Sequence, residues 1–432
     1  MIYFYYAASA VVLLLFLLLL LHNMRQAILA GLVLTTLTLG ALPFRVIPVS
    51  GVALAIQMGF LVLAFSWLFM RKDTSLALSY IANPYTLLLV VFGLVLVAYL
   101  LLSDNPSYGL TTTIWFLVKG FLPVVALGCL APFDEADARL IVVTIVCGAL
   151  LMALALLSWS GGQETERFGL GNDDSPITIA RVIGQGATLL LLLAFLKPGI
   201  KLVRFSLFAL VATFLLFALS LTGSRGPLVA ALLAVLIGFL LLGSGFGKRL
   251  RTILAIGMVA ILILAIVALL PIEILGFPGI ERIVDRFDTF GQNASDRARL
   301  SFFQTAWDGF VASSGLGVGT GGYATLRGIE GRAYPHNIVL EVAVGQGIVG
   351  LVVLFAVLLV TGRQILRLSR NPELDVFSKA LVVLWFYALF NAFVSMDIAG
   401  NYFLWVTGGM IWFFERGTGM FQSQVTVPST AM

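Results

Sequence analysis

The sequence predicts an all-α polytopic membrane protein, and three observations carry the prediction. First, 60% of the 432 residues are hydrophobic and only 11% are charged, whereas roughly a quarter of the residues in soluble domains are charged. Second, apolar runs of about 20 residues, the length that crosses a bilayer as a helix, follow one another along most of the chain. Third, one largely polar stretch, 272–336, interrupts them. We expect a single transmembrane domain over residues 1–432 with 272–336 as an inserted loop.

Thirteen segments have the length and composition of a span. They are 2–21, 25–42, 50–70, 84–102, 110–131, 138–159, 177–196, 201–221, 227–245, 251–271, 337–361, 376–394 and 400–414. If the number is twelve, one early segment is re-entrant or two merge. No small-residue cleavage site follows the leucine-rich run at 11–21, so we interpret it as a retained span and not as a signal peptide. Cys129 and Cys147 lie inside apolar runs, as packing residues do.

The positions of the basic residues indicate the cytoplasmic face, because loops on that side of a membrane protein are enriched in Lys and Arg. If every segment spans, the basic clusters fall on one face: Arg71 and Lys72, 197–204, Lys248, Arg249 and Arg251, Arg363, Arg367 and Arg370, and Arg416. The opposite, extracytoplasmic face then receives the loops 103–109, 161–175, 222–226, 272–336 and 397–401. The net charge of +5 therefore reflects orientation in the membrane, and we expect no nucleic-acid partner.

The polar stretch contains a short amphipathic helix of its own. Ser295 and Asp296 place a hydroxyl and an acid where a helix begins, and apolar residues then recur at helical spacing. These are Leu300, Phe303, Trp307, Phe310 and Val311. Arg297 and Arg299 lie off this stripe or at its edge, so both are free to face a cavity.

A glycine-rich run follows at 315–323, with Gly317 and Gly319 inside it. Its glycines permit left-handed backbone and consecutive exposed N–H groups, an arrangement that binds anions. The alternative is a turn that returns the chain to the membrane. The run follows no predicted strand and lacks a Gly-Lys-Ser/Thr ending, which excludes a dinucleotide-binding or P-loop signature.

His336 is one of only two histidines. It follows Pro335 and precedes an apolar segment, so it should lie at the N-terminal end of a helix that begins near Asn337. The positive end of a helix disfavours an imidazolium, and a neutral ring can accept a proton near pH 7. We expect His22 at the opposite face. A capping or interfacial histidine is the alternative interpretation.

The turn Thr222–Pro227 holds Arg225 at the membrane boundary. Pro227 suits the first turn of a helix, and Gly223 and Gly226 let the chain reverse within a few residues. Positive-inside orientation opposes an arginine on this face, whereas its planar guanidinium can bind phosphate oxygens at two points. Snorkelling of the side chain to the interface is the other interpretation.

Lys119 and Arg181 lie within apolar segments. A charged side chain is unfavourable in lipid, so both should face a polar cavity or pair with an acid.

In their order, spacing and sidedness, these motifs resemble those of the O-antigen ligase and O-antigen polymerase superfamily. The resemblance covers residues from about 205 to 365 and the rest of the chain by hydropathy. It rests on the turn Thr222–Pro227, Arg299 upstream of Trp307, the glycines Gly315, Gly317 and Gly319, and Pro335, His336 and Asn337 with Leu340 and Glu341.

That resemblance implies metal-independent glycosyl transfer without a cofactor, in the periplasm, from a glycan on undecaprenyl diphosphate. It makes Arg225 and Arg299 the diphosphate-binding residues, with Arg297 as a neighbour of Arg299 that could take its place, and His336 the catalytic residue. As supporting residues we add Ser224, Asn337, Gly317, Gly319, Arg181 and Lys119.

The residue types suit this chemistry independently of the resemblance. A diphosphate is already a good leaving group, so an enzyme must neutralise its charge and remove a proton from the acceptor hydroxyl. Two arginines stabilise the departing charge electrostatically, and a neutral histidine accepts the proton. Attack on the face opposite the diphosphate would invert the anomeric centre.

Other functions stay open. A metal-dependent glycosyltransferase would use Glu164, Glu166, Asn172, Asp173 and Asp174, because carboxylates suit Mg²⁺ or Mn²⁺, although Asp173 and Asp174 before Ser175 equally cap a helix. A lipid-linked oligosaccharide flippase could use Lys119 and Arg181, but paired broken helices in two halves are not visible.

Within the superfamily we favour a ligase that transfers the glycan to lipid A core over a polymerase that joins lipid-linked repeats. Members that modify protein side chains are disfavoured by the modest length and the lack of a large C-terminal extension. The implied location is the bacterial inner membrane, and the implied partners are the lipid-linked donor, the lipid A core acceptor and membrane lipids.

Overall fold

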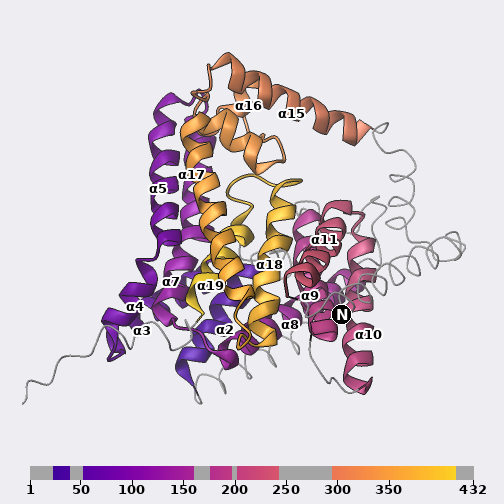
Figure 1. Ribbon diagram of the computed structural model, residues 1–432. Helices are drawn as coiled ribbons and strands as arrows, with labels where there is room; N and C mark the ends of the chain where they lie inside the picture. The colour runs from indigo at the N-terminus through magenta and orange to yellow at the C-terminus, as the bar shows by residue number, and fades with distance from the viewer. Residues whose placement is uncertain (1–22, 39–51, 160–175, 197–201, 243–293, 415–432) are drawn as a thin grey trace, which may run out of the picture.

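The computed structural model describes residues 23–38, 52–159, 176–196, 202–242 and 294–414. In these ranges the chain forms helices and no strand (Figure 1). Seven of the described helices are long and apolar enough to cross a membrane, and four shorter apolar helices accompany them. The predicted all-α polytopic membrane fold is confirmed. The predicted spans at 2–21 and 251–271, and His22, lie outside the described ranges.

The first half of the described chain contains α2 (Met24–Leu37), α3 (Val52–Met70), α4 (Thr74–Ile81), α5 (Pro84–Ala98), the 3-10 turn η2 (Tyr99–Leu102), α6 (Pro106–Trp115), the π-helical turn η3 (Phe116–Phe121), α7 (Leu122–Leu130) and α8 (Glu135–Trp159). The second half contains α9 (Pro176–Leu196), α10 (Leu202–Leu221), α11 (Arg225–Leu242), α15 (Ala294–Ala312), α16 (Tyr323–Leu326), α17 (Ile338–Ser369), α18 (Val376–Ala392) and α19 (Tyr402–Phe413). The short helices α4 and α16 and the turn η3 were not predicted.

Local signals explain where several helices begin. Asn83 and Asn105 each precede a proline, and their side chains accept hydrogen bonds from the amides of Thr86 and Tyr108. Asp375 caps α18 in the same way. These caps satisfy amides that a helix N-terminus leaves without an intrahelical partner.

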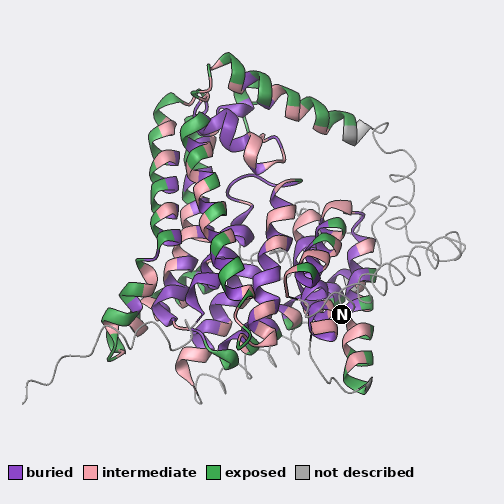
Figure 2. Ribbon diagram, viewed as in Figure 1, coloured by how far each residue is buried: buried purple, intermediate pink, exposed green. Residues whose placement is uncertain are grey.

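The core of the bundle surrounds α9, which packs against α8, α10, α11 and α18. Small residues allow this close packing: a Cβ on Gly238 of α11 would lie 2.8 Å from Leu192 of α9. Figure 2 shows the buried interior and, on the outer helices, the exposed faces. Exposed leucine, valine and phenylalanine side chains on these outer faces are the surface expected to meet lipid.

The segment 294–336 covers one end of the bundle, which we call the α15 end. Here α15 lies across the ends of the spans (Figure 1). It begins at Ala294, one residue before Ser295, where the sequence predicts the start of a helix. The glycine-rich run then returns the chain to α17, where Gly347 breaks the helix with a φ of 61° and a ψ of −153°.

The glycine run and the break in α17 fit each other through their backbones. The amides of Val318 and Gly319 donate to the carbonyls of Val344 and Gly345 at 2.7 and 2.9 Å, and the amide of Ile348 donates to Gly315 at 2.9 Å. The run therefore takes up carbonyl groups that lose their helical partners at the kink. These hydrogen bonds anchor the glycine run to α17 at the kink.

Candidate active site

A pocket at the α15 end brings together residues from four segments of the chain. Its lining consists of Ile177 from α9, Gly223, Ser224, Arg225, Gly226 and Pro227 from the turn before α11 and its first residues, Arg299 from α15, and Val394 and Ser395 after α18. Its volume is about 40 Å³, more than the roughly 10–15 Å³ that one water needs. Arg225 and Arg299, predicted to act together, share this pocket.

The turn before α11 presents Arg225 through local backbone geometry. Gly223 adopts a φ of 64°, a left-handed conformation that glycine adopts without strain. The Thr222 hydroxyl donates to Leu219 at 2.7 Å and accepts from the amide of Ser224 at 3.2 Å. Arg225 is the first residue of α11, so an anion in this pocket would meet both its guanidinium and the positive end of an 18-residue helix.

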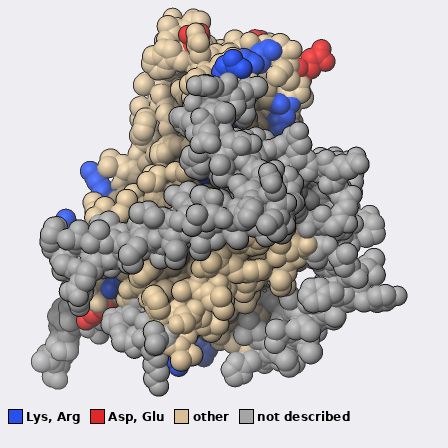
Figure 3. Space-filling view, turned by 90° about the vertical axis from the view of Figure 1, so that its right-hand side faces the viewer, with Lys and Arg blue, Asp and Glu red and all other residues tan. Residues whose placement is uncertain are grey.

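Two predicted arginines on α15 occupy different environments. Arg299 is half-buried and lines the pocket, whereas Arg297 is exposed and does not line it. Residues two positions apart on a helix point in different directions, which explains the difference. Figure 3 shows Lys and Arg side chains gathered at the end of the molecule where α15 lies.

His336 does not line this pocket; it lies in the loop that leads into α17. Its ring stacks on the Phe302 ring, with the two ring centroids 5.7 Å apart, and its centroid lies 4.4 Å from that of the Tyr334 ring. Its φ of 59° places it in the left-handed region, which is uncommon for a residue other than glycine. Its Nδ1 atom is buried and has no hydrogen-bond partner among the described residues.

Burial and, after it, the positive charge of Arg299 lower the pKa of His336 to about 4, with smaller opposing effects of Asp397, which raises it, and Arg332, which lowers it. The ring is therefore neutral at pH 7, as the sequence predicts. The cause differs from the predicted one, because burial has the largest effect, followed by Arg299. The effect of Arg299 also shows that this arginine acts on His336 as well as lining the pocket with Arg225.

A buried acid organises the loop beside His336. Asp397 is 3% exposed and accepts from Arg332 at 2.9 and 3.0 Å and from the hydroxyl of Tyr108 at 3.2 Å. Its other oxygen accepts from the amide of Gly400 at 2.7 Å. Burial is the largest single effect and lowers the pKa of Arg332, but the charge and hydrogen bond of Asp397, together with Tyr334 and Tyr108, leave it raised. Sequence reasoning did not identify Asp397, Arg332 or Tyr108 as site residues.

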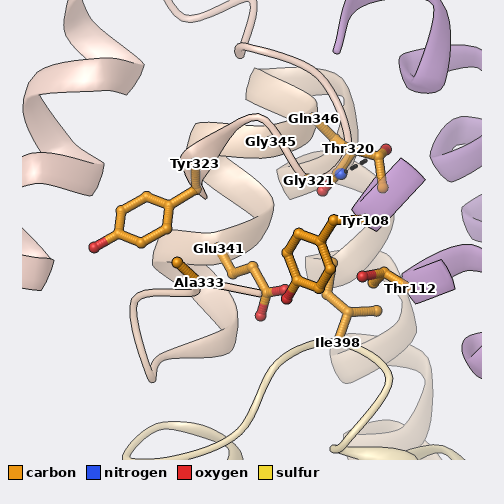
Figure 4. Close-up of a pocket in the computed structure, with 10 residues that line it drawn as sticks. All are labelled: Tyr108, Thr112, Thr320, Gly321, Tyr323, Ala333, Glu341, Gly345, Gln346 and Ile398. Carbon is orange, nitrogen blue, oxygen red and sulfur yellow. Dashed lines mark hydrogen bonds between the residues drawn. The ribbon is translucent and has the colours of Figure 1, made fainter. Parts of the chain in front are cut away.

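Beneath this loop lies a second, smaller cavity of about 10 Å³ (Figure 4). Among its lining residues, Thr112, Glu341 and Gln346 each bury a side-chain oxygen that has no partner among the described residues. Figure 4 shows Tyr108 and Glu341 pointing toward each other across the cavity. The Tyr108 hydroxyl also donates a hydrogen bond to Asp397. Polar side chains therefore extend from the His336 loop into the first turn of α17. Glu341 entered the sequence analysis only as part of a motif.

Arg181 holds the segment 391–401 beside the pocket. It is 1% exposed, and its guanidinium donates to backbone oxygens of Asn391, Ser395 and Gly400 and to the side chains of Ser395 and Asn401 at 2.8–3.2 Å. Among the described residues it forms no ion pair with an acid, so the predicted alternative of an acidic partner is not seen there. Arg181 is not part of the pocket lining, but its hydrogen bonds hold Ser395, which is.

Lys119 lies apart from the pocket, on the π-helical turn η3. Its ammonium sits 4.5 Å from the centre of the Trp115 ring and 5.9 Å from that of Tyr402. Aromatic faces attract cations, so these rings stabilise the ammonium, and within the described ranges Lys119 forms no ion pair with an acid.

Asn337 and the glycine run have local structural contacts. Asn337 caps α17 by accepting from the amides of Val339 and Leu340, and its amide donates to Phe393 at 2.9 Å. The amides of Gly317, Val318, Gly319 and Thr320 all donate within the protein. These contacts favour the interpretation of the run as a turn that returns the chain to the membrane, over that of an anion-binding loop.

The residues of the metal-dependent alternative, Glu164, Glu166, Asn172, Asp173 and Asp174, lie outside the described ranges. Within those ranges, no group of three His, Cys, Asp or Glu side chains is placed to hold a metal ion.

Comparison with known proteins identifies one domain. Residues 208–355 match the family described as O-antigen ligase, which confirms the resemblance to the O-antigen ligase and polymerase superfamily. The matched span contains Arg225, Arg299 and His336. No curated protein matches the chain.

Proposed function

We propose that this membrane protein, whose residues 208–355 form an O-antigen ligase family domain, is an O-antigen ligase. It transfers a glycan from undecaprenyl diphosphate to the core oligosaccharide of lipid A, without a metal and with inversion at the anomeric carbon. The observation that carries the proposal is the meeting of Arg225 and Arg299 in one pocket, with His336 held beside Arg299 by the Phe302 ring.

The arginine pocket suits the donor. A diphosphate ester carries negative charge before the reaction and gains more as the glycosidic bond breaks. Two guanidinium groups can each bind phosphate oxygens at two points, and the N-terminus of α11 adds a positive helix end. Such preorganised charge stabilises the leaving group without reorganisation of solvent.

His336 suits the acceptor. An acceptor hydroxyl attacks the anomeric carbon, the carbon–oxygen bond to the diphosphate breaks, and the bonding electrons stay on the diphosphate. The hydroxyl proton moves to the neutral imidazole of His336. Since the pKa of His336 lies at about 4, the ring is ready to accept a proton at neutral pH but is a weak base, so proton transfer should be late in the reaction.

The proposed location is the bacterial inner membrane, with the α15 end in the periplasm. This orientation follows the positive-inside pattern of the sequence and puts the pocket on the side where a flipped donor would be found. The partners are the lipid-linked glycan, the lipid A core acceptor and membrane lipids.

A polymerase that joins lipid-linked repeats would use the same donor chemistry, so the acceptor decides between the two functions. We would supply purified protein in nanodiscs with an undecaprenyl-diphosphate glycan and either lipid A core or further donor. A ligase forms glycosylated lipid A core, whereas a polymerase lengthens the donor glycan. A flippase gives neither product.

The same assay separates metal from non-metal catalysis. Transfer should survive excess EDTA, because arginines neutralise the diphosphate. Loss of transfer on chelation, with recovery on addition of Mg²⁺ or Mn²⁺, would contradict the mechanism and direct attention to the acids at 164–174.

A further inference from the structure

Helix α15 presents three different faces. Its buried face carries Ala306 and Gly309 and packs against α17 and α16. One exposed face is polar and carries Arg297, Ser301 and Asp308. The predicted apolar stripe forms the third face.

That stripe is not buried in the protein. Leu300, Trp307 and Val311 are exposed by 61, 55 and 57%, and Phe303 and Phe310 are half-buried. A loop surrounded by water rarely exposes so many large apolar side chains on one side of a helix, and such a surface usually contacts a protein or a membrane. Figure 2 shows α15 with little burial along its outer side.

The two flanks of the helix differ in what they approach. On the polar flank, Arg327 donates to the hydroxyls of Ser301 and Thr305 at 3.0 and 3.3 Å. On the apolar flank, the Phe310 ring lies next to Gly315: a Cβ added to Gly315 would be 3.6 Å from the ring. The stripe therefore points toward the chain segment that joins α15 to α17.

This segment continues the stripe onto a lipid-facing helix. Leu316 is 61% exposed, and the adjacent Gly315 accepts a hydrogen bond from the amide of Ile348 on α17 at 2.9 Å. Below Ile348, the outer face of α17 is apolar and exposed at Val352, Phe355 and Leu359. One apolar surface thus runs from a membrane-spanning helix to α15.

We propose that α15 lies in the membrane interface, with Leu300, Trp307 and Val311 inserted among the lipids and Arg297, Ser301 and Asp308 toward water. The partner is the bilayer surface itself. An amphipathic helix with tryptophan on its apolar face and arginine beside it is suited to this position, since both side chains favour the boundary between headgroups and hydrocarbon.

This placement has a consequence for Arg299, which lies on α15 between the buried face and the stripe. A helix seated in the interface holds Arg299 at the depth of lipid headgroups. The diphosphate of a membrane-anchored ligand lies at that same depth. The membrane contact of α15 stands independently of the proposed transfer activity, because it rests on exposure and continuity alone.

The test compares neighbouring positions on α15 in the full-length protein. In a background with Cys129→Ala and Cys147→Ala, single cysteines replace Trp307 or Val311 on the stripe, and Asp308 or Ala312 as matched controls. All four positions are exposed, so labelling with an environment-sensitive fluorophore requires no unfolding. The protein is placed, one copy per disc, in nanodiscs of phosphatidylethanolamine and phosphatidylglycerol with or without headgroup-proximal spin-labelled lipid.

Labels at 307 and 311 should emit at shorter wavelength than labels at 308 and 312, and spin-labelled lipid should quench them at least about twofold more, as insertion requires. Equal, water-like emission and equal quenching at all four positions would overturn the proposal. So would protection at 307 that appears only with two copies per disc and without lipid quenching, because the stripe would then be an interface between copies.

Discussion

Two arginines near the same pocket illustrate how burial separates a structural role from a binding role. Arg181 is buried and uses its guanidinium to hold the 391–401 segment. Arg225 is half-buried and lines the pocket with Arg299. The same residue type thus has two kinds of environment within one site, and substitutions should distinguish them.

Arg181→Lys should lower the thermal stability of the protein, whereas Arg225→Lys should leave it nearly unchanged. An ammonium cannot reach the several acceptors that the guanidinium of Arg181 satisfies, and each buried polar group left unpaired costs about 1–3 kcal/mol. We expect a loss of about 2–3 kcal/mol for Arg181→Lys, measured by thermal unfolding in detergent. Equal stability of the two variants would remove the structural role of Arg181.

The depressed pKa of His336 predicts the pH dependence of transfer. A base works in its neutral form, and His336 takes up a proton only as the pH falls toward about 4. The single-turnover rate should therefore stay level from pH 8 to about 5, where an ordinary histidine with a pKa near 6.5 would already lose activity.

Arg299→Gln provides the matching test, because it removes a positive charge that lowers this pKa. The acidic limb of its residual activity should move to higher pH while staying below about 6.5, since burial continues to disfavour the imidazolium. An acidic limb near pH 6.5 in the wild-type protein would show that His336 is not the group that titrates.

At the residue scale, the sequence was informative where a residue type is unusual for its setting. Arg225, Arg299 and His336 stood out as charges or a rare histidine beside apolar segments. Asp397, Arg332 and Tyr108 did not, because their ion pair and hydrogen bond form only when the segments at 108, 332 and 397 meet. An acid in a short loop between two apolar segments was the available signal for Asp397.

At the element scale, the glycine run packs closely against the broken helix α17 and against the end of η2. Gly319 has a φ of 89°, and a Cβ there would collide with the backbone of Ser103. Gly328 has a φ of 64°, and a Cβ there would meet nothing within 4 Å. Both glycines have left-handed backbone, but only Gly319 is also in close contact, so comparing alanine substitutions at the two positions isolates the cost of the close contact.

Gly328→Ala should destabilise the protein by about 1 kcal/mol, the order of the left-handed penalty for a residue with a Cβ. Gly319→Ala should destabilise it by at least about 2 kcal/mol more, because the backbone of η2 or of the run must also move. Thermal unfolding of the two purified variants measures the difference. Similar stability would mean that the run does not depend on close contact with η2.

The sequence predicted the described spans well because hydropathy and length are local properties of the chain. It did not predict the kink at Gly347 or the π-helical turn at Lys119. At the kink, carbonyl groups of α17 accept hydrogen bonds from the glycine run. The hydrophobic periodicity of one segment cannot indicate a partner elsewhere in the chain. The apolar stripe of α15 was predicted, but its exposure was not, since periodicity does not say what a face contacts.

At the scale of the whole molecule, the pocket exists only because a turn, a loop helix and the segment after α18 meet at one end of the bundle. Orientation in the membrane then decides which compartment the site serves. Cysteines introduced singly near 224, 290 and 330 should react with an impermeant maleimide added to intact spheroplasts. Labelling only after lysis would place the α15 end in the cytoplasm.

The most direct test of the central claim separates donor binding from transfer in four variants. His336→Ala should abolish single-turnover transfer while donor binding stays nearly intact, since the base acts mainly as the new bond forms. Arg225→Lys and Arg299→Lys should weaken both, because an ammonium keeps the charge but loses the two-point contact. Arg297→Lys, on the exposed side of the same helix, is the matched control and should resemble wild type. Transfer at near wild-type rate by His336→Ala, or equal donor affinity in Arg225→Lys, Arg299→Lys and Arg297→Lys, would contradict the account.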